Sequence, residues 1–222
     1  MTVAVLLGAP GAGKGTQAPI LAQALGVPIL ASGDLLRAAV AAGTPLGREA
    51  DRYMSRGQLV PDETIVRVFL DRLEKPDAKV GAVLDGYPRT RVQAVALDEA
   101  LKDAGRRVDR AIFIDVEPED LVRRMSNRRI CTANGHVYNL ASNPPKTDGV
   151  CDLDGSELVQ RPDDDEETVR ARMKEQIPPL LEVVDHYRKA GVLQTVDGRE
   201  PISDVSDRLL RALTTAPGQV SA

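Results

Sequence analysis

A short glycine-rich segment near the N-terminus carries the residues best suited to hold a phosphate group. Residues 8–16, GAPGAGKGT, fit the pattern G-x-x-x-x-G-K, in which glycines let the loop curl so that its backbone N–H groups point inward. A helix beginning at Lys14 would add the positive end of its dipole, and the lysine itself a full positive charge. The spacing predicts a nucleoside triphosphate site. The residues expected to form it are Gly11, Ala12, Gly13, Lys14, Gly15 and Thr16.

The residue after the lysine departs from the general pattern. Gly15 stands where most such loops have Ser or Thr, so the hydroxyl that usually serves magnesium is displaced by one position, to Thr16. This favours a kinase of small molecules that holds Mg²⁺ largely through water molecules. Asp85 and Asp34 are the carboxylates expected to orient that hydrated ion.

The elements around this loop alternate between buried strands and helices. Residues 3–7, before the loop, form a continuous apolar run typical of a strand buried on both faces of a parallel sheet. Helical spacing follows over 15–25 and ends near Gly26, a residue suited to a left-handed C-cap. Such alternation predicts a three-layer α/β fold, with a parallel sheet flanked by helices. Further strands are expected at 81–85, 110–116 and 192–196, and a last helix at 202–213.

Two stretches interrupt the alternation. Residues 31–60 have helical spacing broken by Gly43, Gly47 and Gly57, which predicts a small helical insertion. Residues 127–164 are polar and rich in turn sequences such as Asn134-Gly135, which predicts a second insertion of short hairpins. We expect residues 1–222 to form a single domain that carries both insertions and ends in a frayed tail at 216–222.

The composition excludes several classes of protein. The 222 residues are 42% hydrophobic and 28% charged, which argues against a disordered or fibrous chain. A formal net charge of -4 does not favour a general binder of nucleic acid or of anionic membranes. No apolar run approaches the roughly 20 residues that cross a bilayer, and no leader pattern opens the chain, so we expect a cytoplasmic protein.

Motifs spread along most of the chain resemble the adenylate kinase family, in its bacterial form with a long lid. The resemblance begins at 8–17 and continues with ASGDLLR at 31–37 and DGYPRT at 85–90. Further matching segments lie at 57–60, 128–129, 137–138, 143–146, 161–164 and 166–172. The resemblance implies a P-loop fold with a helical AMP-binding insertion at 31–60 and a small hairpin lid at 127–164.

The same resemblance implies reversible, Mg²⁺-dependent phosphoryl transfer, in which ATP and AMP give two ADP. Arginines would clamp the α-phosphate of AMP, the Gln93 amide would pair with the adenine edge, and the backbone of 58–60 would line the base pocket. The matching positions for AMP are Ser32, Arg37, Gln58, Leu59, Val60, Gly86, Tyr87, Pro88, Arg89, Gln93, Arg161 and Arg172. A kinase with UMP or CMP as acceptor, or GTP as donor, is the alternative within this class.

On the ATP side the resemblance adds Arg124, Arg128, Val137 and Tyr138 to the glycine loop. No nucleophilic side chain is implied, because an oxygen of the AMP phosphate is the acceptor and catalysis rests on positioning and charge neutralisation. The residues expected to act in catalysis are Lys14, Arg89, Arg124, Arg128, Arg161, Arg172, Asp85 and Asp34. ATP, AMP and ADP are the expected partners of a monomer with no nucleic-acid or membrane partner.

The two cysteines of the second insertion stand in zinc-ribbon spacing. CTAN begins at Cys131 and CDLD at Cys151, so each cysteine is followed three positions later by a polar residue. In metal-bearing members of the resembled family these positions are usually Cys, Cys, Cys and then Cys or Asp, whereas here the second is Asn134. Cys131, Cys151 and Asp154 could hold structural zinc with His136 or water as fourth ligand. A disulfide and a metal-free cluster of polar side chains are the alternatives.

Two other classes of nucleotide-binding protein are alternatives to a kinase. A P-loop switch or ATPase would need a positioned water and effector loops, and it leaves the segment 85–89 unexplained. A noncatalytic nucleotide sensor would not need the arginines of the second insertion. A second nucleotide site discriminates the kinase from both.

Overall fold

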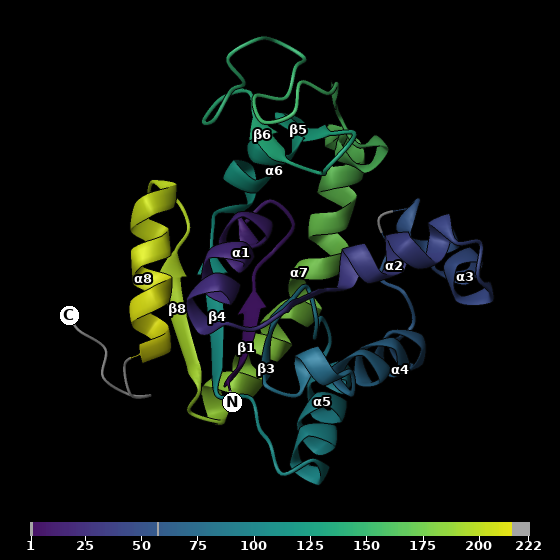
Figure 1. Ribbon diagram of the computed structural model, residues 1–222, viewed down its shortest axis with the longest axis vertical. Coiled ribbons are helices and arrows are strands. Elements are labelled where there is room, and N and C mark those ends of the chain that lie inside the picture. Colours follow the sequence, from purple (N-terminus) through teal and green to yellow (C-terminus); the bar gives the residue numbers. More distant parts are fainter. Residues whose placement is uncertain (1, 57, 215–222) are drawn as a thin grey trace.

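The computed structural model describes residues 2–56 and 58–214 (Figure 1). Gly57, predicted to break a helix, and the predicted tail at 216–222 lie outside the described residues.

A five-stranded parallel sheet forms the centre of the molecule. Its strands lie in the order β2-β3-β1-β4-β8. The middle strands, β1 (Thr2–Leu7), β3 (Gly81–Asp85) and β4 (Arg110–Asp115), are mostly buried, as their apolar runs predict. The outer strands are β2 (Ile29–Ala31) and β8 (Leu193–Asp197). The three-layer α/β fold is confirmed, and the three residues of β2 are the strand that the sequence pattern did not reveal.

Helices cover both faces of this sheet. α1 (Lys14–Leu25) packs against α8 (Ile202–Thr214), and α5 (Arg91–Asp103) packs against α7 (Glu166–Lys189). The right-handed connections between parallel strands place these two pairs on opposite faces (Figure 1). α1 ends at Gly26 in the left-handed conformation, with φ of 65°, as the sequence predicts.

The first insertion is helical. Between β2 and β3 the chain forms α2 (Ser32–Ala41), α3 (Pro45–Met54), α4 (Asp62–Leu73) and the short η1 (Pro76–Ala78). α2 and α3 pack closely at Gly47, where a Cβ would lie 2.0 Å from the carbonyl oxygen of Ala39. In Figure 1 these helices project to one side of the sheet.

The second insertion lies above the sheet in Figure 1 and has its own small sheet. It follows α6 (Pro118–Ser126) and contains β5 (Arg128–Cys131), β6 (Val137–Asn139) and β7 (Leu158–Val159), which pair antiparallel in the order β6-β5-β7. The turn η2 (Pro162–Asp164) then leads into α7. None of the helices described here has the length and apolar character needed to span a membrane.

Candidate active site

The glycine loop connects the carboxyl end of β1 to the first turn of α1. Gly11 and Gly13 have φ of 86° and 101°, a left-handed backbone that other residues rarely adopt. At Gly11 space is short as well, because a Cβ would lie 2.9 Å from Cγ of Met125 on α6. Gly13 is the N-cap of α1, so the free N–H groups of that helix face the same space as the loop.

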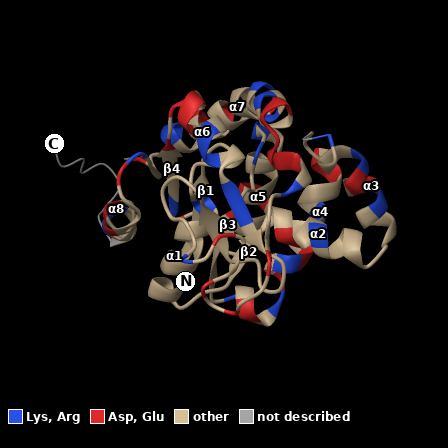
Figure 2. Cartoon of the chain, turned by 90° about the horizontal axis from the view of Figure 1, so that it is seen from above, with Lys and Arg blue, Asp and Glu red and all other residues tan. Residues whose placement is uncertain are grey.

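One cavity of about 1040 Å³ opens above this loop. Small-molecule pockets usually have roughly 300–1,000 Å³, so this one has ample room for more than a single mononucleotide. The glycine loop lies between its two sides. One side consists of α2, residues 58–60 and the segment 85–93; the other consists of α6, residues 198–205 and the second insertion. Figure 2, which looks down from the side of β5 and β6, shows basic ribbon near β1 and α6 in the middle of the molecule.

Lys14 curls back over the loop that carries it. Its Nζ donates hydrogen bonds to the carbonyl oxygens of Gly8, at 2.7 Å, and Ala9, at 3.0 Å. Burial of the ammonium group lowers the pKa of Lys14 to about 8, against the attraction of Asp85. A bound polyphosphate would supply the negative charge that this buried cation lacks.

Arg89 is held at the end of β3 by groups from separate elements. Its Nε donates to the Gly86 carbonyl oxygen at 2.7 Å, and its Nη2 to the Ser32 hydroxyl at 3.1 Å. Burial, followed by repulsion from Arg172, lowers the pKa of Arg89 to about 10, so the group remains a cation at neutral pH. Gly86 leaves space for this contact, since a Cβ there would lie 2.7 Å from Oγ of Ser32.

Asp85 ends β3 beside the glycine loop. Burial raises the pKa of its carboxyl group, opposed by the positive charges of Lys14 and Arg89. Among the described residues none donates a hydrogen bond to this carboxylate, which leaves it available to water molecules around a cation. Asp34 also lines the cavity, but its carboxylate forms an exposed ion pair with Arg37 at 2.5 Å.

Gln93, on the first turn of α5, is 2% exposed and lines the same side of the cavity. Its Oε1 accepts a hydrogen bond from the backbone N–H of Arg89 at 2.7 Å. Its Nε2 donates one to Oδ1 of Asp62, the first residue of α4, at 2.6 Å. Hydrogen bonds at both its oxygen and its nitrogen therefore fix the orientation of the Gln93 amide.

Arginines of the second insertion and its borders face the cavity from above. Arg172 of α7 donates to Oδ2 of Asp163 at 2.8 Å, while Arg124 of α6 donates to the carbonyl oxygen of Gly198 at 2.8 Å. Among the described residues none forms a hydrogen bond or an ion pair with the Arg161 side chain, although its backbone carbonyl oxygen accepts from the N–H of Asp164 at 3.0 Å. Burial and the nearby Arg37 lower its pKa, as expected of a cation held among other cations.

The structure brings nearly all the residues expected at the nucleotides into this one cavity. Two tyrosines are the exceptions. Tyr87 is fully buried and stacks on Phe69, with ring centroids 4.0 Å apart, beneath the cavity lining. Tyr138 is buried within the second insertion, where its hydroxyl accepts from the backbone N–H of Asp152 at 2.8 Å. Neither side chain reaches the cavity, because each fills a packed interior instead.

One segment of the lining is not among the residues predicted from the sequence. The connection between β8 and α8, residues 198–201, and the start of α8 at 202–203 border the cavity beside the glycine loop. Gln17 of α1 holds this segment there, since its Nε2 donates to the carbonyl oxygen of Ile202 at 3.1 Å. Its position at the carboxyl end of a predicted parallel strand could have revealed this segment, because ligands bind along that edge of such sheets.

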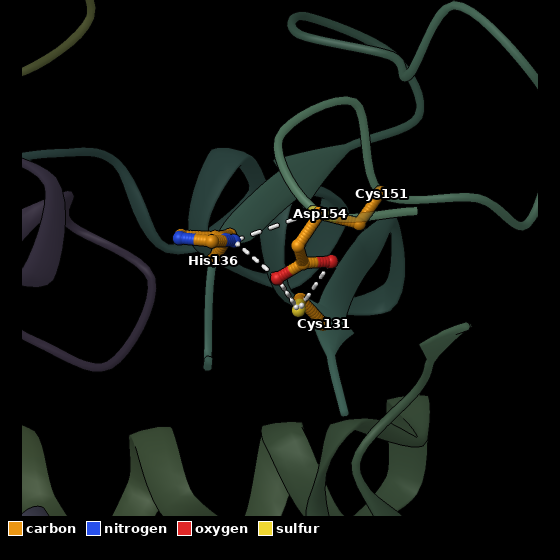
Figure 3. A group of neighbouring side chains, drawn as sticks. All are labelled: Cys131, His136, Cys151 and Asp154. Atoms are coloured by element: carbon orange, nitrogen blue, oxygen red, sulfur yellow. Dashed lines mark hydrogen bonds and ion pairs between the residues drawn. The ribbon is translucent and has the colours of Figure 1, made fainter. Parts of the chain in front are cut away.

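The two cysteines meet in the second insertion together with a histidine and an aspartate (Figure 3). Ligand atoms of Cys131, His136, Cys151 and Asp154 all lie within 4.8 Å of one another. His136 Nδ1 is 3.3 Å from both Cys151 Sγ and Asp154 Oδ2, and Cys131 Sγ is 3.2 Å from that same oxygen. Both thiols are free, so the structure contains no disulfide between them.

The three contacts at 3.2–3.3 Å are close to the spacing of neighbouring ligands in a tetrahedral metal site. Bonds of about 2.0–2.3 Å to zinc place neighbouring ligand atoms roughly 3.3–3.8 Å apart. Asn134 occupies the second position of the zinc-ribbon pattern but does not belong to this cluster of four side chains. Its Nδ2 instead donates a hydrogen bond to Oδ2 of Asp154 at 2.8 Å. His136 is the fourth side chain of the group in place of Asn134.

Comparison with known proteins points in one direction. The sequence matches the family model described as adenylate kinase over residues 6–192. It is 47% identical to the adenylate kinase of Exiguobacterium sibiricum over 201 residues, which are 90% of this chain and 94% of that protein. The identity with the adenylate kinase of Streptomyces griseus is also 47%, over 94% of this chain and 96% of that protein. The adenylate kinase of Archaeoglobus fulgidus is 47% identical over 90% of this chain and 93% of its own length.

Proposed function

The chain belongs to the adenylate kinase family and so is a nucleoside monophosphate kinase, and we propose how its cavity carries out the transfer. ATP binds with its phosphates on the glycine loop and Lys14, and AMP binds on the side formed by α2, residues 58–60 and Arg89. The observation that carries this proposal is the single cavity, with the phosphate loop between two sides that each offer apolar and polar contacts.

Phosphoryl transfer between these sites depends on position and charge. With both nucleotides in one cavity, an oxygen of the AMP phosphate lies in line with the terminal phosphate of ATP, and no covalent intermediate is needed. Negative charge on the moving group is met by cations from separate elements. Lys14 comes from α1, Arg89 from the loop between β3 and α5, Arg124 from α6, Arg128 and Arg161 from the second insertion, and Arg172 from α7.

Mg²⁺ fits the carboxylate donors that face the glycine loop. Asp85 presents an oxygen donor without a hydrogen-bond partner among the described residues, and Asp34 lies on the same side of the cavity. The ion, when bound, would supply positive charge that neutralises part of the charge of the phosphates. Asp85 would orient its water ligands, and Asp34 would do so when released from Arg37.

The second insertion, residues 127–164, acts as a lid in this proposal, and residues 31–60 as the AMP-binding insertion. Arginines on the lid gain a strong counter-ion only when polyphosphate is present, so nucleotide charge favours closure. Closure removes water that could otherwise take the phosphoryl group. We propose AMP as acceptor over UMP or CMP, because the relatives that match most of the chain are adenylate kinases and the buried Gln93 amide offers a donor and an acceptor that suit the adenine edge.

A structural divalent metal, zinc by the chemistry of its donors, would bind to Cys131, His136, Cys151 and Asp154. Two thiolates, an imidazole and a carboxylate form a closed tetrahedral set with no open position for substrate. The metal would hold the turn after β5 to the turn before β7 and so stiffen the lid. We also propose that the protein works as a monomer in the cytoplasm, where a reducing environment would keep both thiols free.

A coupled assay with a panel of nucleotides tests the proposed reaction. AMP, CMP, UMP and GMP are each offered as acceptor with ATP and then with GTP as donor. The proposal expects the highest kcat/KM for ATP with AMP, and ADP as the only product. ATP hydrolysis without an acceptor at a comparable rate would instead indicate an ATPase.

A further inference from the structure

The Gln93 amide is fixed in direction by two partners of opposite kind. The Arg89 backbone N–H can only donate and the Asp62 carboxylate can only accept, so the oxygen must face Arg89 and the nitrogen must face Asp62. An amide without such partners could turn over and exchange its donor and acceptor. Of the two partners, only Asp62 is a side chain that substitution can remove.

Asp62 is itself held in place and does not reach the cavity. Its Oδ2 accepts a hydrogen bond from the Thr90 hydroxyl at 2.9 Å, while Oδ1 accepts from Gln93 at 2.6 Å. It is absent from the residues that line the cavity, whereas Gln93 is among them. Asp62 can therefore act on a bound base only through Gln93.

We propose that Asp62 is a positioning residue that sets the base selectivity of the acceptor site by fixing the direction of the Gln93 amide. This inference rests on the proposed placement of the acceptor base against Gln93. With one bond used at each end, Gln93 Oε1 can still accept one hydrogen bond and Nε2 can still donate one.

The remaining donor and acceptor match a base with an amino group. Adenine presents an exocyclic amino donor beside a ring-nitrogen acceptor, and both pair with the fixed amide. Hypoxanthine presents an oxygen acceptor beside a ring N–H donor, so acceptor faces acceptor and donor faces donor. Inosine monophosphate differs from AMP in this edge alone, and a site with a fixed amide rejects it.

Steady-state kinetics of Asp62→Ala test the proposal with AMP and IMP as acceptors. The ratio of kcat/KM for AMP to that for IMP is expected to fall roughly tenfold, the discrimination that one pair of hydrogen bonds to a base edge supplies. KM for ATP stays unchanged. Glu63→Ala is the matched control, because Glu63 is the next residue on α4, pairs with the exposed Arg67 and touches neither Gln93 nor the cavity.

A double-substitution cycle separates positioning from a general structural effect. Gln93→Met removes the amide and lowers the same ratio, and adding Asp62→Ala to it is expected to change the ratio no further. If Gln93→Met lowers the ratio but Asp62→Ala does not, the proposal for Asp62 fails while the placement of the base stands. If Gln93→Met leaves the ratio unchanged, both fail.

The conservative variant covers the case in which Asp62→Ala does not fold. Asp62→Asn keeps the shape of the side chain and replaces a charged acceptor with a weaker neutral one. Its ratio is expected to fall about threefold. Asp62→Leu removes the acceptor altogether, and a folded Asp62→Leu with the ratio of the unaltered enzyme overturns the proposal.

Discussion

Arg128 of the lid donates two hydrogen bonds to the carboxylate of Asp164, from Nε at 2.8 Å and from Nη2 at 2.5 Å. The Asp164 side chain is fully buried, and Nη1 of Arg172 lies 3.9 Å from its Oδ1. One carboxylate thus holds an arginine of β5 and faces an arginine of α7 at the base of the lid. In the proposed mechanism both arginines move from this shared carboxylate toward phosphate when ATP binds.

Asp164→Asn is expected to destabilise the protein more than an ordinary surface substitution. Loss of the buried charge leaves Arg128 without its ion-pair partner and leaves Arg172 with Asp163 alone. Breaking a buried pair such as that of Arg128 and Asp164 costs about 3–5 kcal/mol of unfolding free energy. Urea unfolding measures the difference. Glu166→Gln, which removes an exposed partner of Arg170, is the control and is expected to cost below about 1 kcal/mol. Equal losses in the two variants would contradict this role of Asp164.

The affinity for ATP is expected to weaken as the pH rises above about 8. Lys14 has a pKa of about 8 in the free protein, so it loses its positive charge above that pH. Bound phosphate favours the charged form and raises the pKa, so binding takes up a proton and the affinity falls by up to about tenfold per pH unit. Fluorescence titration with an ATP analogue from pH 6.5 to 9.5 measures this. Lys14→Arg, which stays charged, should show no such fall.

Gln17→Met is expected to raise KM for ATP and leave KM for AMP unchanged. Gln17 is buried at 3% exposed, and its amide joins α1 to Ile202 and to the Ser206 hydroxyl, at 3.1 and 2.8 Å. Losing these bonds frees the segment 198–203 that borders the donor side of the cavity. Gln23→Met, on the exposed face of the same helix, serves as the control. A rise in KM for AMP alone would place this segment on the acceptor side.

Metal removal is expected to lower the melting temperature without abolishing activity at 25 °C. The four proposed ligands lie in the lid and are not among the residues that line the cavity, so a metal bound there would support the folding of the lid rather than the chemistry. Elemental analysis should find zinc in the unaltered protein and little in His136→Ala. Asn134→Ala, which removes a neighbour outside the ligand set, should retain it. A protein free of metal after growth with zinc would refute the site.

The central strands and the phosphate loop were predictable because their patterns are local. Val3 to Leu7 form an uninterrupted apolar run, and the glycines and Lys14 follow it directly. β2 was not predicted, because three residues with one buried side chain are too few to show the alternation of a strand. The last helix was also predictable, and it begins at Ile202 as expected.

The contacts that join distant parts of the chain could not be read from the sequence. Asp62 and Gln93 are 31 residues apart, and Gln17 and Ser206 are 189 apart, so no local spacing connects them. His136 was one of several alternatives for a fourth ligand until folding of the lid brought it beside Cys151. Tyr138 was predicted to contact ATP. The direction of its side chain in β6 instead places it inside the lid.

Calorimetric titration with a bisubstrate compound, two adenosines joined by five phosphates, tests most directly whether one cavity holds both nucleotides. We predict one molecule bound per chain, with an affinity that far exceeds those of ATP and AMP, and complete loss of binding of either nucleotide afterwards. Binding of ATP to a protein already saturated with the bisubstrate compound, or AMP binding unaffected by it, would contradict the account.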